Sequence, residues 1–188
     1  EAVKAADKAI SYWPDKLDFR FMKANAYIAY EKESPDMALS CLMSLIDENK
    51  TRISTWEYEG DKVGQDFFQN AVQEYCFSFY SLGTTGGYEA FRTVSEKMSE
   101  LFPDNPGFIN NIGTYHLIAK NDYKTAYKYY NKVLKEHPDD YTAIKNGILA
   151  ARKQGNVKTE KKYLEMMLKY GSETEKLQAR TRLDSMKK

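Results

Sequence analysis

The chain has 188 residues, of which 42% are hydrophobic and 29% are charged, a balance typical of a folded globular protein and not of a disordered one. Its two cysteines cannot form a disulfide framework, and we expect Cys41 and Cys76 to fill small spaces in the core. No stretch approaches the roughly 20 apolar residues of a membrane-spanning helix, so we expect a soluble chain whose compartment the sequence does not indicate.

The formal net charge of +1 hides an uneven distribution. Residues 1–122 carry 12 basic and 19 acidic side chains, a net charge of −7, whereas residues 123–188 carry 16 basic and 8 acidic ones, a net charge of +8. Such a split can indicate an anionic partner for the basic half or head-to-tail association between copies of the chain. Two differently charged solvated surfaces are the favoured explanation, because exposed charge is ordinary on helices.

The first predicted element is a helix over residues 1–14, with alanines at helical spacing and Pro14 at its end. The chain opens in the middle of a helical pattern, so we expect upstream sequence to have been removed and apolar surface to be exposed at this end. Residues 15–47 continue as a helical hairpin with its turn at residues 31–36. The apolar positions of this hairpin are Ala24, Tyr27, Ala38, Leu42 and Leu45.

Residues 48–64 interrupt the helical pattern as an irregular insertion, and no part of the chain gives comparable support for strands. Trp56 and Tyr58 stand here among carboxylates, whose oxygens could in principle bind a hard cation. The spacing fits no calcium loop, so we expect a solvated acidic loop without a metal, with its aromatic side chains packed on the core.

Residues 65–104 are predicted to form a second, more divergent hairpin that ends at Pro103. Apolar residues from Phe67 to Phe79 recur at helical spacing, and a second helix covers residues 88–102. The segment from Gly83 to Gly87 is rich in glycine but lacks the Gly-Lys-Ser/Thr ending of a phosphate-binding loop. We interpret it as the turn of the hairpin.

The clearest helical hairpin covers residues 105–138. Asn105 can cap its first helix, Pro106 suits the first helical position, and Asn121 can end the helix. The second helix starts at Asp122 and stops before Pro138. Residues 139–171 repeat this pattern, with a start at Asp139 or Asp140 and a turn at residues 154–156.

A constant spacing connects these two hairpins. Ala126 and Glu160, Tyr130 and Leu164, and Val133 and Met167 are each 34 positions apart. A fixed period of this length is typical of stacked two-helix repeats, because one hairpin cannot bury its apolar face without neighbours. We therefore predict an all-α fold, an α-α superhelix or solenoid of antiparallel helical hairpins, as one domain over residues 1–188.

The spacing resembles the tetratricopeptide repeat, whose pattern is W-x2-L-G-x2-Y, then A-x3-F, then P. The best match consists of Ile109, Ile112-Gly113, His116, Ala126, Tyr130 and Pro138, with one extra residue in the turn at residues 119–122. The next repeat departs from the pattern at Glu160 and Ser172. The resemblance implies that residues 1–14 are the second helix of a truncated repeat and that residues 172–188, which open with a capping box at Ser172 and Glu175, are a capping helix.

The resemblance also implies a concave groove lined by the first helix of each hairpin. Carried over position by position, the predicted partner-binding residues are Phe21, Asn25, Asn110, Thr114, Lys145, Leu149 and Arg152. Some members of the family hold the C-terminal carboxylate of a peptide with paired Lys, Asn and Arg side chains. Here the corresponding pairs are Phe21/Asn25 and Lys145/Leu149, so that clamp is incomplete.

These observations favour a non-catalytic scaffold that binds a protein or peptide and needs no cofactor. Two histidines and two cysteines at unrelated spacings offer little for catalysis, and we interpret His116 and His137 as structural residues. The alternatives are polyanion or nucleic-acid binding through the basic half, which is the less favoured partner class, and self-assembly. The basic candidates lie on one predicted helix and are Lys124, Lys128, Lys132 and Lys135. The identity of the partner does not follow from the sequence.

Overall fold

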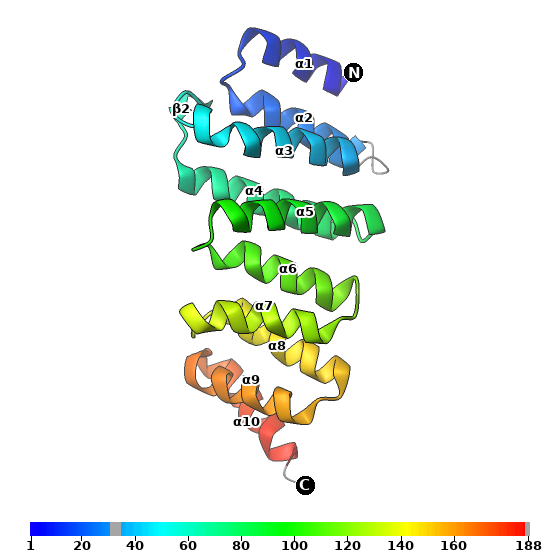
Figure 1. Ribbon diagram of the computed structural model, residues 1–188, viewed down its shortest axis with the longest axis vertical. Coiled ribbons are helices and arrows are strands. Elements are labelled where there is room, and N and C mark those ends of the chain that lie inside the picture. The colour runs from blue at the N-terminus through cyan, green and yellow to red at the C-terminus, as the bar shows by residue number, and fades with distance from the viewer. Residues whose placement is uncertain (31–34, 187–188) are drawn as a thin grey trace. The chain divides into compact units, whose positions relative to one another are not determined.

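The computed structural model describes residues 1–30 and 35–186. The described residues form ten α helices and one two-stranded hairpin, and antiparallel helical hairpins follow one another along the chain (Figure 1), which confirms the predicted all-α solenoid class. The chain divides by packing into two compact units, Glu1–Leu101 and Phe102–Lys188. No helix in the described part of the chain combines the length and apolar content that crossing a membrane requires.

The first unit contains five helices and the two short strands. Helix α1 packs on α2, α2 on α3, and both α3 and α4 on α5. The predicted turn at residues 31–36 falls largely on residues 31–34, outside the described residues, and the next helix begins at Pro35. The elements are α1 (Ala2–Tyr12), α2 (Leu17–Tyr30), α3 (Pro35–Arg52), β1 (Glu57–Tyr58), β2 (Asp61–Lys62), α4 (Gln65–Ser81) and α5 (Thr85–Leu101).

The segment predicted as an irregular insertion contains regular structure. Helix α3 continues to Arg52, and β1 pairs antiparallel with β2 through Glu57 opposite Lys62 and Tyr58 opposite Asp61. Glu59 and Gly60 join the strands with φ of 49° and 94°. The absence of strand signals was therefore misleading here, because two-residue strands are too short to show alternation and Glu-Gly is not among the common hairpin turns.

Trp56 of this loop packs inward as predicted, whereas Tyr58 is only half-buried. Trp56 is fully buried, and its ring centroid lies 5.6 Å from that of Phe68. The carboxylate of Glu57 forms ion pairs with Lys16 and Lys62, and the Val63 amide donates to the Trp56 carbonyl. The loop is thus a closed hairpin fastened to α2 and α4, and part of its acidic charge is neutralised by lysines.

The turn between α4 and α5 is shorter than the predicted Gly83–Gly87 segment. Gly83 has a φ of 65°, and α5 begins at Thr85, so Gly86 and Gly87 lie within the first helical turn. A Cβ atom on Gly87 would lie 2.6 Å from the Phe79 carbonyl oxygen. Gly87 therefore allows the two helices to pack closely and does not belong to a wide turn.

The second unit contains five helices, and the cap predicted at Asn105 and the helix start predicted at Asp122 are both confirmed. The Asn105 side chain accepts from the Gly107 amide at 2.9 Å, and Asp122 accepts from the Thr125 amide at 3.1 Å. Asp140 and Asn156 cap the next two helices in the same way. The elements are α6 (Pro106–Ile118), α7 (Tyr123–Glu136), α8 (Tyr141–Gln154), α9 (Val157–Tyr170) and α10 (Glu173–Ser185).

Glycine and tyrosine set the spacing within each hairpin of this unit. A Cβ atom on Gly113 would lie 2.6 Å from Cε1 of Tyr130, and one on Gly147 would collide with the ring of Tyr163. The residue against Gly147 is thus Tyr163 and not Leu164, which the period of 34 pairs with Tyr130. The aromatic ring one position earlier fills the space that the missing side chain leaves, and Leu164 is buried beside it.

Helix α10 closes the described part of this unit. Ser172 and Glu175 form the predicted capping box, and Ala179 is buried in the cluster shared by α7, α8 and α9. Leu183 and Met186 pack against the same cluster. The remaining face of α10 carries mostly polar residues, with Leu177 exposed among them, which is the arrangement expected of a helix that covers the apolar side of its neighbours.

Candidate functional site

The predicted binding residues of the last hairpin lie together. Lys145, Leu149 and Arg152 line a surface depression of about 510 Å³ between α8 and α10, which we call the α8–α10 depression. Their spacing of four and three residues places them on one face of α8. The other lining residues are Tyr141, Asn146, Ile148, Leu164, Met167, Glu175, Gln178 and Ala179.

This depression combines an apolar floor with a charged rim in which two cations outnumber one carboxylate. Ile148, Met167 and Ala179 are buried beneath it, while Leu149 is 40% exposed. The Lys145 ammonium lies 5.6 Å from the centroid of the Tyr141 ring. A ligand in this depression would therefore meet aliphatic surface, two cationic side chains and the single carboxylate of Glu175, a combination that suits a peptide with apolar and acidic residues.

Glu160 fixes the position of Arg152 and connects it to α10. The Arg152 Nε donates to the Glu160 carboxylate at 2.6 Å, and Arg182 donates to the same carboxylate through two nitrogens at 2.8 and 3.0 Å. Hydrogen bonds from Arg182 and then Arg152 lower the pKa of Glu160, so the carboxylate stays ionised although its side chain is nearly buried. The departure of Glu160 from the repeat pattern was the only sequence signal for this pair of salt bridges.

Asn110 and Thr114 connect α6 to α8. Asn110 is only 2% exposed and its amide donates to the Asp140 carboxylate at 3.0 Å. The Asn146 amide donates to the Thr114 hydroxyl at 3.1 Å. These two predicted binding residues therefore hold successive first helices in register, and little of the Asn110 side chain is accessible to a ligand.

The remaining predicted residues, Phe21 and Asn25, belong to the first unit. They line a separate depression of about 390 Å³, which we call the aromatic depression, between α2, β1 and α4. Phe21 is buried and Asn25 is exposed. The other residues that line it are Tyr58, Phe67, Asn70, Ala71, Glu74, Tyr75 and Ser78. Tyr58 could not be predicted from helical spacing because it comes from the β hairpin.

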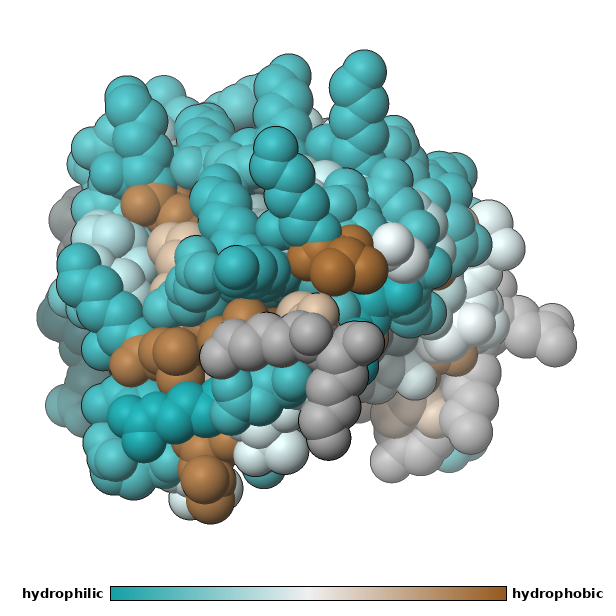
Figure 2. Space-filling model, turned by 90° about the horizontal axis from the view of Figure 1, so that it is seen from below, coloured by the Kyte–Doolittle hydropathy of each residue, from teal (hydrophilic) through white to brown (hydrophobic). Residues whose placement is uncertain are grey.

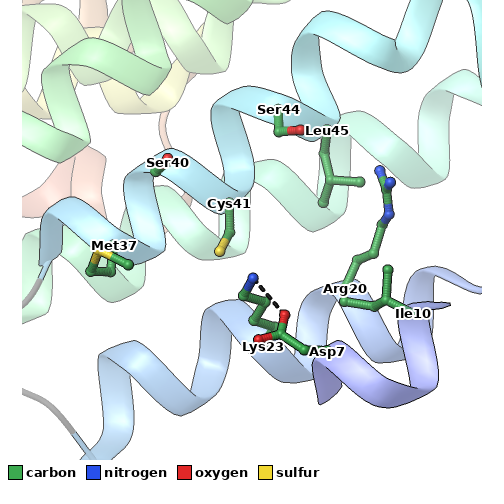
Figure 3. A pocket seen from close by; sticks show the side chains of 9 residues that line it. All are labelled: Asp7, Ile10, Arg20, Lys23, Met37, Ser40, Cys41, Ser44 and Leu45. Atoms are coloured by element: carbon green, nitrogen blue, oxygen red, sulfur yellow. Dashed lines mark ion pairs between the residues drawn. The ribbon is translucent and has the colours of Figure 1, made fainter. Parts of the chain in front are cut away.

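A third depression of about 280 Å³ contains the one cysteine with partial exposure (Figure 3), among the residues that the structure describes. The Cys41 thiol points toward Lys23, and the Lys23 ammonium forms an ion pair with Asp7 at 2.7 Å. Burial raises the pKa of the Cys41 thiol, the nearby Lys23 ammonium partly opposes this, and the Asp7 carboxylate raises the pKa further. The thiol is thus held in its protonated, weakly nucleophilic form.

The histidines and the basic helix occupy the places expected of structural and surface residues. The His116 ring stacks on Tyr129 at 5.8 Å, and His137 ends α7. The four lysines of α7 are exposed, whereas Tyr130 is buried. Within residues 1–30 and 35–186, no group of three or more His, Cys, Asp and Glu side chains is placed to hold a metal ion.

The molecular surface on the side where α10 lies in Figure 1 is mostly hydrophilic (Figure 2). Separate hydrophobic patches emerge between the hydrophilic side chains. The exposed apolar residues of the second unit include Tyr141, Leu149, Val157 and Leu177. This is a mixed surface, as the chemistry of the α8–α10 depression also indicates.

One comparison with known proteins found a family model that matches part of the chain. Residues 115–183 match the family model described as the TT21 fifth ARM repeats domain. The matched segment runs from α6 to α10 and includes all the residues that line the α8–α10 depression. It supports the class of helical repeat proteins, of which armadillo and tetratricopeptide repeats are two types. A search of curated proteins found no match.

Proposed function

We propose that this chain is a non-catalytic protein-interaction scaffold that binds a peptide segment with apolar and acidic side chains in the α8–α10 depression. The observation that carries the proposal is the convergence of Lys145, Leu149 and Arg152 on one depression with an apolar floor. Helical repeat domains typically serve as such scaffolds, and the matched segment includes all the residues that line this depression.

The proposal includes a repeat type. The approach of Tyr130 to Gly113 and of Tyr163 to Gly147, together with the buried Ala126, supports hairpins of the tetratricopeptide type. Residues 105–138 and 139–171 are the two regular repeats of this proposal, and residues 172–188 are the capping segment. Residues 1–14, 15–47 and 65–104 are the more divergent part of the same series.

The depression is arranged before any ligand binds. Arg152 is held by Glu160, and Lys145 lies on a helix whose first turn is capped by Asp140. A peptide would therefore bear most of the ordering cost on binding, which favours short segments with a few well-placed anchors. Salt should weaken the interaction moderately, because two exposed cations contribute to it.

The test is a selection of random peptides displayed on phage against the wild-type chain, the variant Lys145→Glu and the matched control Lys128→Glu. The control makes the same charge change on an exposed lysine of α7 outside the depression. We expect wild type and control to enrich segments that contain Asp or Glu beside Leu, Ile or Phe, and Lys145→Glu to lose at least tenfold in affinity for them.

Other results would contradict the proposal in distinct ways. Equal binding by all three proteins would show that the peptides do not bind in the α8–α10 depression. Loss of binding with Lys128→Glu, together with a steep dependence of affinity on salt, would favour a polyanion site on α7 instead. A mass that increases with concentration, measured by sedimentation, would favour self-assembly.

A further inference from the structure

The aromatic depression of the first unit brings four rings together from three elements. The ring centroids of Phe21 and Tyr75 lie 5.5 Å apart, those of Phe21 and Tyr58 lie 6.0 Å apart, and those of Tyr58 and Phe67 lie 5.0 Å apart. Phe21 belongs to α2, Tyr58 to β1, and the other two rings to α4. The rings thus form a continuous series along one wall of the depression.

The positions of these rings are set by the fold. The Tyr75 hydroxyl donates to the Phe21 carbonyl oxygen at 3.0 Å, and both residues are buried, so their rings form the fixed base of the depression. Tyr58 belongs to the hairpin that the buried Trp56 and the ion pair between Lys16 and Glu57 hold in place. The rings therefore need no ligand to order them, and a ligand would meet a surface that is already formed.

The polar groups of the depression are anionic or neutral. Glu74 is the only charged residue among those that line it, and Asn25, Asn70 and Ser78 supply neutral oxygens. Within the described residues, no ion pair is formed by the exposed Glu74 carboxylate. The sequence of α4 contains no lysine, arginine or histidine, and residues 1–101 carry 17 acidic against 11 basic side chains.

Aromatic faces and a carboxylate favour one class of ligand. The face of an aromatic ring carries negative partial charge and attracts ammonium and guanidinium groups. Lysine and arginine also have apolar stems that can cover rings while the charged end reaches a carboxylate. A neutral apolar ligand would use the rings but not Glu74, and an anion would be repelled by Glu74.

We infer that the aromatic depression binds an organic cation, namely the lysine or arginine side chain of a protein segment. The stem of the side chain lies on the accessible rings of Tyr58 and Phe67, and its charged end pairs with Glu74. This inference rests on the proposed function only in that a bound protein supplies the cation, and it concerns a different site in the other unit.

The experiment is a nuclear magnetic resonance titration of the full chain with n-butylammonium, n-butylguanidinium and the neutral 1-butanol at constant ionic strength. The three probes share the four-carbon stem, so their comparison isolates the charge. We expect both cations to shift the signals of Tyr58, Phe67 and Glu74, and to bind at least fivefold more tightly than 1-butanol. Equal affinity of the neutral probe, or shifts located elsewhere on the chain, would overturn the inference.

A pair of variants tests the role of the carboxylate. Glu74→Gln keeps the size of an exposed side chain and should weaken cation binding at least fivefold without changing the affinity for 1-butanol. Glu100→Gln, an exposed change on α5 outside the depression, should leave both affinities unchanged. Unchanged cation binding by Glu74→Gln would contradict the inference, and the comparison of probes on the wild-type chain requires no variant to fold.

The outcome is independent of the acidic-peptide site. Peptides selected on the wild-type chain should bind Glu74→Gln as tightly as wild type, because Glu74 does not line the α8–α10 depression. Failure of cation binding with intact peptide binding would refute this inference alone, and the reverse result would refute the proposed function alone.

Discussion

The contact between Gly147 and Tyr163 gives a prediction with a calculable size. In Gly147→Ala the new Cβ atom would lie 2.6 Å from both Cδ1 and Cζ of Tyr163. Carbon atoms pack best at about 3.5–4.0 Å, so the ring would have to move by about 1 Å. Tyr163 is fully buried and its ring stacks with that of Tyr127 at 6.2 Å, which leaves it little room.

Two effects of this substitution oppose each other. Overpacking of this severity costs about 3 kcal/mol, at the upper end of the usual range. Alanine is a better helix former than glycine by about 1 kcal/mol. We therefore expect Gly147→Ala to lower the free energy of unfolding by about 2 kcal/mol. Gly113→Ala should cost less, because the atoms of Tyr130 lie slightly farther from its new Cβ atom.

The assay is urea unfolding followed by circular dichroism at 222 nm. The decisive control is the same substitution in a Tyr163→Leu background, where the ring is absent. There Gly147→Ala should be neutral or stabilise the chain by up to about 1 kcal/mol, because only the helix propensity remains. A neutral or stabilising effect of Gly147→Ala in the wild-type background would refute the close packing of glycine and tyrosine.

Three further predictions concern the Glu160 salt bridges, the β hairpin and the capping helix. Glu160→Gln should lower the free energy of unfolding by about 1 kcal/mol at neutral pH, a small value because both arginines are partly solvated. The two arginines lower the pKa of Glu160 from its ordinary 4.5, so the wild-type advantage over the glutamine variant should be complete above about pH 4.5 and disappear as the pH falls through the folded pKa. Trp56→Ala should cost about 3–5 kcal/mol in urea unfolding, and a loss under 1 kcal/mol would mean that the hairpin is not anchored on the core. Deletion of residues 172–188 should yield insoluble or self-associated protein by light scattering, whereas a monomeric and fully helical product would show that α10 is dispensable.

Features that depend on neighbouring residues could be predicted from the sequence. The caps at Asn105, Asp122 and Ser172 each require one side-chain oxygen and an amide two or three positions later. The period of 34 placed the buried residues of α7 and α9 correctly, because helical repeats must bury the same face. The period was wrong by one residue at Tyr163, because the ring of this tyrosine, and not the side chain of Leu164, packs against Gly147.

The candidate sites were only partly predictable. Lys145, Leu149 and Arg152 could be found because they share one helix face. Asn110 shares the corresponding face of its own helix, but a hydrogen bond to Asp140 buries it, and no pattern within α6 indicates that partner. In the sequence, Glu160 stood out only as a departure from the repeat pattern. The two arginines that donate to its carboxylate lie on different helices, so no local pattern indicates them.

The helices, their order and the repeat that stacks them follow from the amino-acid sequence, because capping and amphipathic spacing act over a few residues. The surface between those helices depends on the folded structure. Phe21 and Tyr75 are 54 positions apart in the sequence. The ring of Tyr58 contacts that of Phe21 from a strand that no periodic pattern in the sequence predicted. Such a surface depends on which side chains packing brings together, and that choice is made by the shapes and charges of residues distant in the chain.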